Sequence, residues 1–246
     1  METQMNNNMH SDLSHSSEKY NASEECVIIY PHVIRKVFLW LSLALALTGC
    51  TAYFVAASQT LMGYMASHIY IFWALFIIEF GLVVAITYNI NKLTSTQSLM
   101  LFVLYSIING ITMSVIFVVY TEESIAVAFF VTAATFAVMS IWGFVTGTNL
   151  SSMGHLLGMG VIGIIIASVV NMFMYSSTLS YIISYAGIVI FTGLTAYDTQ
   201  KIKLQLLYAE DNVEIYRKIA LQGALSLYLD FINLFLYILR IFGQRK

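Results

Sequence analysis

The sequence predicts an all-α protein that crosses a membrane seven times. Hydrophobic residues make up 59% of the 246-residue chain and charged residues only 10%, whereas soluble domains contain about 25% charged residues. Apolar runs of about 20 residues recur along the chain, and this is the length that crosses a bilayer core as a helix. The alternating pattern of a barrel strand is absent, so backbone hydrogen bonding in lipid requires helices.

The elements follow in order along the chain. Residues 1–30 are polar and lack the basic-then-apolar order of a secretory signal, so we predict a disordered cytoplasmic tail. Residues 31–246 form the predicted transmembrane domain, and its short connectors leave no room for a second domain. The seven predicted spans are Phe38–Ser58, His68–Ile90, Leu99–Tyr120, Ser124–Val145, Leu156–Met174, Ser180–Asp198 and Ala220–Phe242.

The distribution of Lys and Arg predicts the orientation, because cytoplasmic loops carry an excess of both. The face that carries the N-terminus has eight of them: Lys19, Arg35, Lys36, Lys92, Lys201, Lys203, Arg217 and Lys218. The other face has Arg240, Arg245 and Lys246, and its loop after the third span carries Glu122 and Glu123. We therefore expect a cytoplasmic N-terminus and a C-terminus outside.

Three acidic side chains lie inside the predicted spans: Glu79 in the second, Asp198 in the sixth and Asp230 in the seventh. An ionised Asp at a bilayer centre costs ~2.5–3.5 kcal/mol on insertion scales, so each is a candidate functional residue. The interior of the spans holds no Lys or Arg that would compensate them, since Arg240 stands near the end of the seventh. Protons or a cation must balance the acids, or the carboxyls must stay neutral.

Asp198 and Asp230 are predicted to meet. If the sixth helix continues through Tyr208 and the seventh begins near Ile219, each carboxylate lies ~15 Å along its helix from the shared turn. Adjacent antiparallel helices would place both at one level, where they can share a proton or face a cation. The alternative is a neutral pair that joins the helices by hydrogen bonds. For Glu79 the alternative is structural pairing with a Ser or Asn of a neighbouring helix.

Other motifs argue against several function classes. Cys26 and Cys50 are too few and too far apart for a disulfide framework or a metal site. A Schiff-base lysine in the seventh span and a Gly-x-Ser-x-Gly elbow are missing. Tyr197-Asp198 matches one motif of intramembrane aspartyl proteases, but Leu227-Tyr-Leu-Asp230 lacks their second, Gly-x-Gly-Asp. We expect no enzyme, no bound cofactor and no nucleic-acid partner.

Glycine pairs recur at close spacing in the later spans and the loop between two of them. They are Gly143/Gly147, Gly154/Gly158 and Gly187/Gly193. Small residues let helix backbones approach closely in membranes, so we expect all three pairs to serve helix packing. A gating hinge is the alternative.

Two segments carry a family resemblance. Gly193-Leu-Thr-Ala-Tyr-Asp-Thr-Gln-Lys-Ile202 and Ala224-Leu-Ser-Leu-Tyr-Leu-Asp-Phe-Ile-Asn-Leu-Phe-Leu-Tyr-Ile-Leu-Arg240 resemble the last two spans of the Bax inhibitor-1 (transmembrane Bax inhibitor motif) family. The layout of seven spans, with Glu79 midway along the second, agrees over about residues 30–246. The short loops are similar to those of the bacterial branch, which implies the bacterial inner (plasma) membrane.

The resemblance implies a fold in which six helices surround a central seventh. It also implies a pH-sensitive calcium leak in which Asp198 and Asp230 are the proton sensor and gate, and Glu79 is a pore carboxylate. Calcium would be the transported ion, held transiently by these three acids. Relatives have a basic latch residue near the cytoplasmic end of the second span, and here the candidates are Lys92, Asn89 and Asn91.

Partners and alternatives follow from the same reasoning. The expected partners are the lipid bilayer, calcium ions and protons. One alternative is a proton-coupled secondary transporter that uses the same acids. Another is a regulator without transport activity that acts on a membrane-protein partner, for example a membrane protease, or in a stress response.

Overall fold

The computed structural model describes residues 31–68, 70–89, 92–209 and 212–246, and within these ranges nearly the whole chain is helical. The helices are Pro31–Ala57, α2 (Gln59–Ser67), α3 (Tyr70–Asn89), α4 (Ser95–Val119), α5 (Glu122–Val145), α6 (Ser151–Met174), α7 (Ser177–Leu207) and α8 (Val213–Phe242). All except α2 are long and apolar enough to cross a membrane. The prediction of seven transmembrane helices is confirmed, whereas the predicted tail of residues 1–30 lies outside the described ranges.

Local sequence explains where several helices begin. The side chains of Thr94, Thr121, Ser176 and Asn212 each accept a hydrogen bond from a backbone N–H in the first turn of the helix that follows. These caps satisfy donors that have no partner inside the helix. Ser58 caps α2 in the same way. The sequence predicts a connector at this place, because the nine residues of α2 are too few to form a span.

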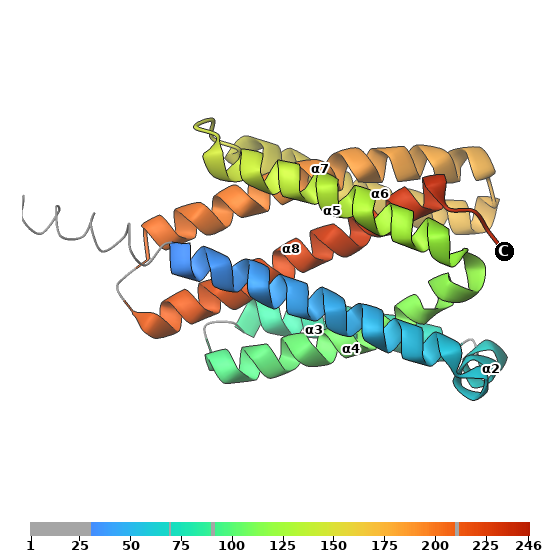
Figure 1. The fold of residues 1–246 in the computed structure, drawn as a ribbon. Helices are drawn as coiled ribbons and strands as arrows, with labels where there is room; N and C mark the ends of the chain where they lie inside the picture. Colours follow the sequence, from blue (N-terminus) through green and yellow to red (C-terminus); the bar gives the residue numbers. More distant parts are fainter. Residues whose placement is uncertain (1–30, 69, 90–91, 210–211) are drawn as a thin grey trace, which may run out of the picture.

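The last two helices form an antiparallel pair at the core of the fold (Figure 1). Gly223 of α8 packs against Ile202 of α7, and Gly187 of α7 packs against Tyr237 of α8. The α7 helix does continue past its lysines, to Leu207. The α8 helix begins at Val213, six residues before the predicted Ile219.

Tertiary contact explains this early start of α8. Its first turn carries Glu214, whose carboxylate accepts hydrogen bonds of 2.8 Å from both the backbone N–H and the hydroxyl of Ser95. Ser95 is the first residue of α4. The polar turn that precedes the apolar part of α8 is therefore held as helix by a contact with another span.

The seventh span, α8, is the most buried of the seven. Half of its most apolar window is buried, compared with 11% for α3 and 6% for α6. It packs against α4, α5 and α7, and its Tyr228 also contacts Thr48 of the first span. Because α3 packs mainly on α4 and α6 mainly on α7, enclosure of α8 by all six other helices stays a prediction.

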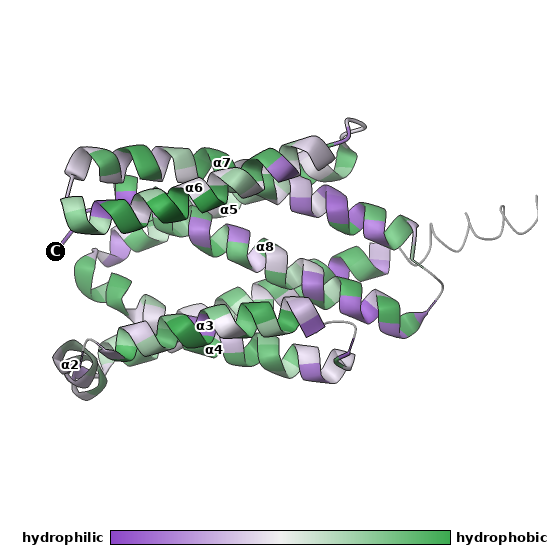
Figure 2. Ribbon diagram, turned by 180° about the vertical axis from the view of Figure 1, so that it is seen from behind, coloured by the Kyte–Doolittle hydropathy of each residue, from purple (hydrophilic) through white to green (hydrophobic). Residues whose placement is uncertain are grey.

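The outer surface is apolar and the interior holds polar groups. Phe54, Ile77, Phe130 and Phe173 are each more than two thirds exposed, and hydrophobic colouring runs along the outer helices (Figure 2). Buried polar side chains include Thr132, Ser140, Thr195 and Thr199. This distribution suits a hydrocarbon solvent, in which polar groups must find partners inside the protein.

The two ends of the bundle differ in charge. The first span begins beside the α7–α8 turn, and the C-terminus lies at the opposite end (Figure 1). The C-terminal segment is fixed there by backbone hydrogen bonds from Thr121 to Gln244 and from Lys246 to Val119. The described basic residues are divided between these ends as the sequence predicts, although the orientation of the chain in the membrane stays a prediction.

Candidate functional site

Asp198 of α7 and Asp230 of α8 come together in the interior. Asp230 is only 4% exposed, and the charge of Asp198 acts on it electrostatically. Asp198 has the hydroxyl of Ser226, one turn before Asp230 on α8, as a hydrogen-bond partner. In the antiparallel register of α7 and α8, Asp198 therefore lies level with Ser226, and the two aspartates are neighbours about one turn out of register rather than at the one level that the sequence predicts.

One carboxylate oxygen of the pair lacks a partner. Oδ2 of Asp230 is buried and accepts no hydrogen bond from any residue that the structure describes. The buried hydroxyls of the facing helix do not help, because Thr195 and Thr199 donate to the backbone carbonyls of Phe191 and Thr195 in their own helix. A buried polar atom without a partner costs free energy, so this oxygen favours a proton or a cation.

A basic residue and a small crevice adjoin Asp198. Lys201, one turn after Asp198 on α7, acts on Asp198 electrostatically. Asp198, Lys201, Gln205, Gln222 and Ser226 line a crevice of about 10 Å³ between α7 and α8, enough for roughly one water molecule. Lys201 and Gln205 lie toward the end of α7 at the α7–α8 turn, so these polar side chains connect Asp198 with that end of the bundle.

The described latch candidates, Asn89 and Lys92, are not among the groups that act on Asp198. The Asn89 amide donates to the carbonyl oxygen of Ala85 in its own helix, at 3.2 Å. Lys92 is exposed, and Asn91 lies outside the described residues. The basic side chain that interacts with Asp198 in this structure is Lys201, a residue of the family segment that was not among the predicted latch residues. Lys201 follows Asp198 by three residues, and residues at this spacing are neighbours on a helix surface, so the sequence could have indicated this interaction.

Glu79 lies in a separate polar cluster, where it is 9% exposed. The Thr112 hydroxyl donates to its Oε1 at 2.6 Å, and the Asn109 amide donates to its Oε2 at 3.4 Å. The Tyr228 hydroxyl in turn donates to Oδ1 of Asn109 at 2.9 Å and lies 2.7 Å from the Thr48 hydroxyl. The cluster thus joins α3, α4, α8 and the first span, and neighbouring polar side chains pair with Glu79.

The hydrogens in this cluster can be counted. With Asn109 oriented as above, the Tyr228 hydroxyl donates its hydrogen to Asn109, and the Thr48 hydroxyl donates its hydrogen to the Ser106 carbonyl. No hydrogen then remains for the 2.7 Å contact between the Tyr228 and Thr48 hydroxyls. If Glu79 is protonated and the Asn109 amide is turned round, Glu79 donates to Asn109, Asn109 donates to Tyr228, and Tyr228 donates to Thr48. Every contact then contains one hydrogen. The neutral form of Glu79 therefore satisfies this cluster better than the ionised form.

The two polar clusters lie on different faces of α8. Tyr228 and Asp230 are two residues apart, which corresponds to about 200° around a helix. Tyr228 faces α4 and the first span, where its ring packs edge-on against Phe102 and Tyr105. Asp230 faces Asp198 on α7. A movement of α8 would consequently act on both clusters.

We expect Glu79→Gln to fold as stably as the parent chain, because a glutamine amide can donate to Asn109 and accept from Thr112 as a neutral acid does. Glu79→Ala should lower the free energy of unfolding by about 1–3 kcal/mol, since the buried Asn109 amide loses its partner on the Glu79 side and keeps only Tyr228. Thermal unfolding in detergent would measure both changes. Equal destabilisation by the two substitutions would contradict a neutral Glu79.

The three acids do not form a single metal site. Among the described residues, no group of three or more His, Cys, Asp or Glu side chains is arranged to hold a metal ion. One version of the calcium prediction is a transient site formed by Asp198, Asp230 and Glu79 together. Glu79 would have to leave its own cluster to form that site. The aspartate pair alone remains the candidate cation site.

Gln200 and Lys203 fix the loop that follows α5. The Gln200 side chain accepts from the N–H of Leu150 and donates to the carbonyl of Thr148, both at 2.8 Å. Lys203 donates to the carbonyl of Phe144 at 2.8 Å. The sequence does not indicate these contacts, because they join residues about 50 to 60 positions apart. They attach the α5–α6 connection to the helix that carries Asp198.

Comparison with known proteins identifies the family. The family model described as "Inhibitor of apoptosis-promoting Bax1" matches residues 31–246, which include both aspartates and Glu79. The chain belongs to the Bax inhibitor-1 family. The match covers all seven spans and leaves out the polar tail, in agreement with the extent of the resemblance in the sequence.

Bacterial members of the Bax inhibitor-1 family are similar along most of their length. The chain is 46% identical over 220 residues to an uncharacterised protein of Borreliella burgdorferi, covering 89% of this chain and 95% of that one. It is 43% identical over 213 residues to the inner membrane protein YbhL of Escherichia coli, covering 86% and 91%. The chain is accordingly an integral membrane protein of this family.

Proposed function

We propose that this protein is a pH-sensitive calcium leak channel gated by Asp198 and Asp230. The observation that carries the proposal is the buried pair itself: two carboxyls act on each other between α7 and α8, and one oxygen of Asp230 has no partner within the part of the chain that the structure describes. Membership of the Bax inhibitor-1 family supports it. The bacterial inner membrane is the proposed location, as the name of the E. coli relative suggests.

The closed state would depend on a shared proton. Two neighbouring carboxylates in a low dielectric cannot both ionise easily, so they titrate as a unit. One proton between them gives a carboxyl–carboxylate hydrogen bond that joins α7 to α8. The same proton would supply the partner that Oδ2 of Asp230 lacks.

Opening would follow loss of that proton. The charged groups that act on the pair are Lys201 on Asp198 and the two aspartates on each other. When both aspartates ionise, their repulsion pushes α8 away from α7. Because α8 also carries Tyr228, the shift would loosen the hydrogen bonds that hold Glu79 in its own cluster.

Calcium suits the groups that such a shift would expose. It is a hard ion that takes six to eight oxygen ligands, as a rule, and the aspartate pair supplies negative oxygens without a preformed cage. Binding would be weak and transient, as conduction requires. Glu79, released from Asn109 and Thr112, would be the second acidic position on the path.

The direct test is Ca²⁺ flux into proteoliposomes that contain the purified full-length protein, measured over a pH series without a pH gradient. We expect passive flux that increases as the pH rises, because deprotonation opens the path. Protein-free vesicles give the background. Absence of flux above this background at every pH would exclude the leak and favour the regulator.

The transporter alternative predicts a different result in the same vesicles. A proton-coupled transporter needs an imposed pH gradient to accumulate its substrate, whereas a leak only dissipates an existing calcium gradient. Accumulation of Ca²⁺ against its gradient when a pH gradient is applied would contradict the channel proposal. Equal rates with and without the gradient support it.

A further inference from the structure

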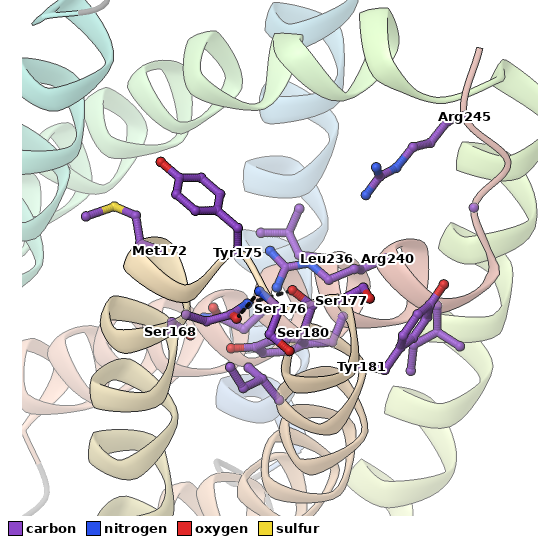
Figure 3. Close-up of a pocket in the computed structure, with 16 residues that line it drawn as sticks. Ser168, Met172, Tyr175, Ser176, Ser177, Ser180, Tyr181, Leu236, Arg240 and Arg245 are labelled. Carbon is purple, nitrogen blue, oxygen red and sulfur yellow. Dashed lines mark hydrogen bonds between the residues drawn. The ribbon is translucent and has the colours of Figure 1, made fainter.

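A polar cavity lies at the end of the bundle that carries the C-terminus, away from the aspartate pair. We call it the C-terminal vestibule; its polar lining includes Asn171, Ser176, Ser177, Ser180, Arg240 and Arg245. Its volume is about 820 Å³, within the range typical of small-molecule sites. The end of α6, the start of α7, the last turns of α8 and the C-terminal segment surround it (Figure 3).

The charge of the vestibule is wholly positive. Its two charged lining residues are Arg240 and Arg245, and Figure 3 shows side chains from α8 and from the C-terminal segment directed toward one cavity. Neither arginine has an ion-pair partner among the described residues. Glu122 and Glu123 begin α5 at the same end, but neither lines this cavity.

The backbone around the vestibule is firmly placed. The Asn171 side chain spans the short α6–α7 turn, because it accepts from the N–H of Ser176 at 3.1 Å and donates to the Ser180 hydroxyl at 2.7 Å. The C-terminal segment is attached to the α4–α5 connection on both sides of Arg245, through Gln244 and Lys246. Both arginines thus project from fixed positions.

We propose that the C-terminal vestibule binds a phosphate-bearing anion, either the headgroup of an anionic phospholipid or a soluble phosphate compound. Two guanidinium groups present planar pairs of N–H donors that match phosphate oxygens. The hydroxyls of Ser176, Ser177 and Ser180 adjoin them and can complete the ligand set. The N-terminal turn of α7 adds further backbone donors at the same place.

This inference is independent of the calcium leak. Two arginines in a lining that contains no Asp or Glu repel a divalent cation, so the vestibule does not suit a calcium entrance. A chain that conducts no ion would bind the anion equally well. Failure of the flux experiment would leave this proposal intact, and failure of the binding experiment would leave the leak intact.

The experiment uses purified full-length protein in a neutral detergent and two probes. Inorganic phosphate is titrated at constant ionic strength, and the midpoint of thermal unfolding is measured against chloride. Phosphatidylglycerol is titrated separately, and native mass spectrometry gives the affinity of the retained lipid relative to phosphatidylcholine. A response to phosphate identifies a soluble ligand, and a response to the lipid alone identifies a headgroup; either supports the site.

The variants are Arg240→Gln with Arg245→Gln, and, as a control of equal charge, Arg35→Gln with Lys36→Gln. The control residues are exposed near the start of the first span, at the other end of the bundle. We expect the vestibule pair to lower affinity by about tenfold or more for each arginine, as for charged hydrogen bonds. The control variant should change the affinity by less than about fivefold, because its residues lie outside the vestibule.

Arg240→Lys keeps the charge but loses the planar fork, so it should bind more weakly than the parent chain. This milder variant carries the test if the double variant does not fold. Binding of both probes by Arg240→Gln with Arg245→Gln at the parent affinity would overturn the proposal. So would an equal loss in the Arg35 and Lys36 control.

Discussion

Replacing Asp198 or Asp230 with Asn should remove the pH dependence of Ca²⁺ flux and hold the flux at its low-pH level. In the parent chain, release of one shared proton can raise the flux by at most about tenfold per pH unit. An Asp–Asn pair carries a single charge at most, so the repulsion that drives α8 from α7 cannot develop. Flux into proteoliposomes at several pH values measures the effect.

The matched control is Glu123→Gln, which removes one exposed carboxylate at the start of α5. It should leave the pH profile of the flux unchanged, because the residue lies far along the sequence and outside the aspartate cluster. If both aspartate variants conduct with the profile of the parent chain, the pair is not the proton sensor. The leak itself could then still exist with another gate.

Gly143→Ala should lower the free energy of unfolding by about 1–3 kcal/mol, the usual cost of overpacking. A Cβ added to Gly143 of α5 would meet the backbone of Ala196 in α7, and a backbone cannot rotate away as a side chain can. Because Ala196 lies two residues before Asp198, the displaced helix would also disturb the aspartate pair. Thermal unfolding in detergent measures the stability.

Gly158→Ala is the control for this prediction. Gly158 also lies inside a helix, but an added Cβ there would meet no atom within 4 Å. We expect no loss of stability, and a gain of up to about 1 kcal/mol from the lower backbone entropy of alanine. Similar losses in both variants would show that helix propensity, and not the contact with Ala196, determines the effect.

The glycine pairs illustrate how far sequence spacing can be trusted. Gly154 packs against Tyr197, Gly187 against Tyr237 and Gly193 against Leu157, as close helix packing predicts. Gly147 and Gly158 face open space instead, so their assignment to packing was wrong. Gly147 lies beyond the end of α5 at Val145, and Gly158 lies in α6 on a face that meets no other described helix; spacing alone indicates neither fact.

The sequence by itself determined the seven spans and the family. Hydropathy decides which segments enter a membrane, because the cost of burying polar groups in lipid is summed over each local segment. The motifs around Asp198 and Asp230 likewise lie within single helices. Their meeting could be expected because a short turn between two long helices makes them antiparallel neighbours.

Only the tertiary structure decided which groups each acid contacts. Asn109, Thr112 and Tyr228 come to Glu79 from other helices, and Lys201 rather than Lys92 adjoins Asp198. The C-terminal vestibule similarly combines α6, α7, α8 and the chain end. These contacts depend on how the helices rotate and tilt against one another, which packing between distant segments sets and local hydropathy does not encode.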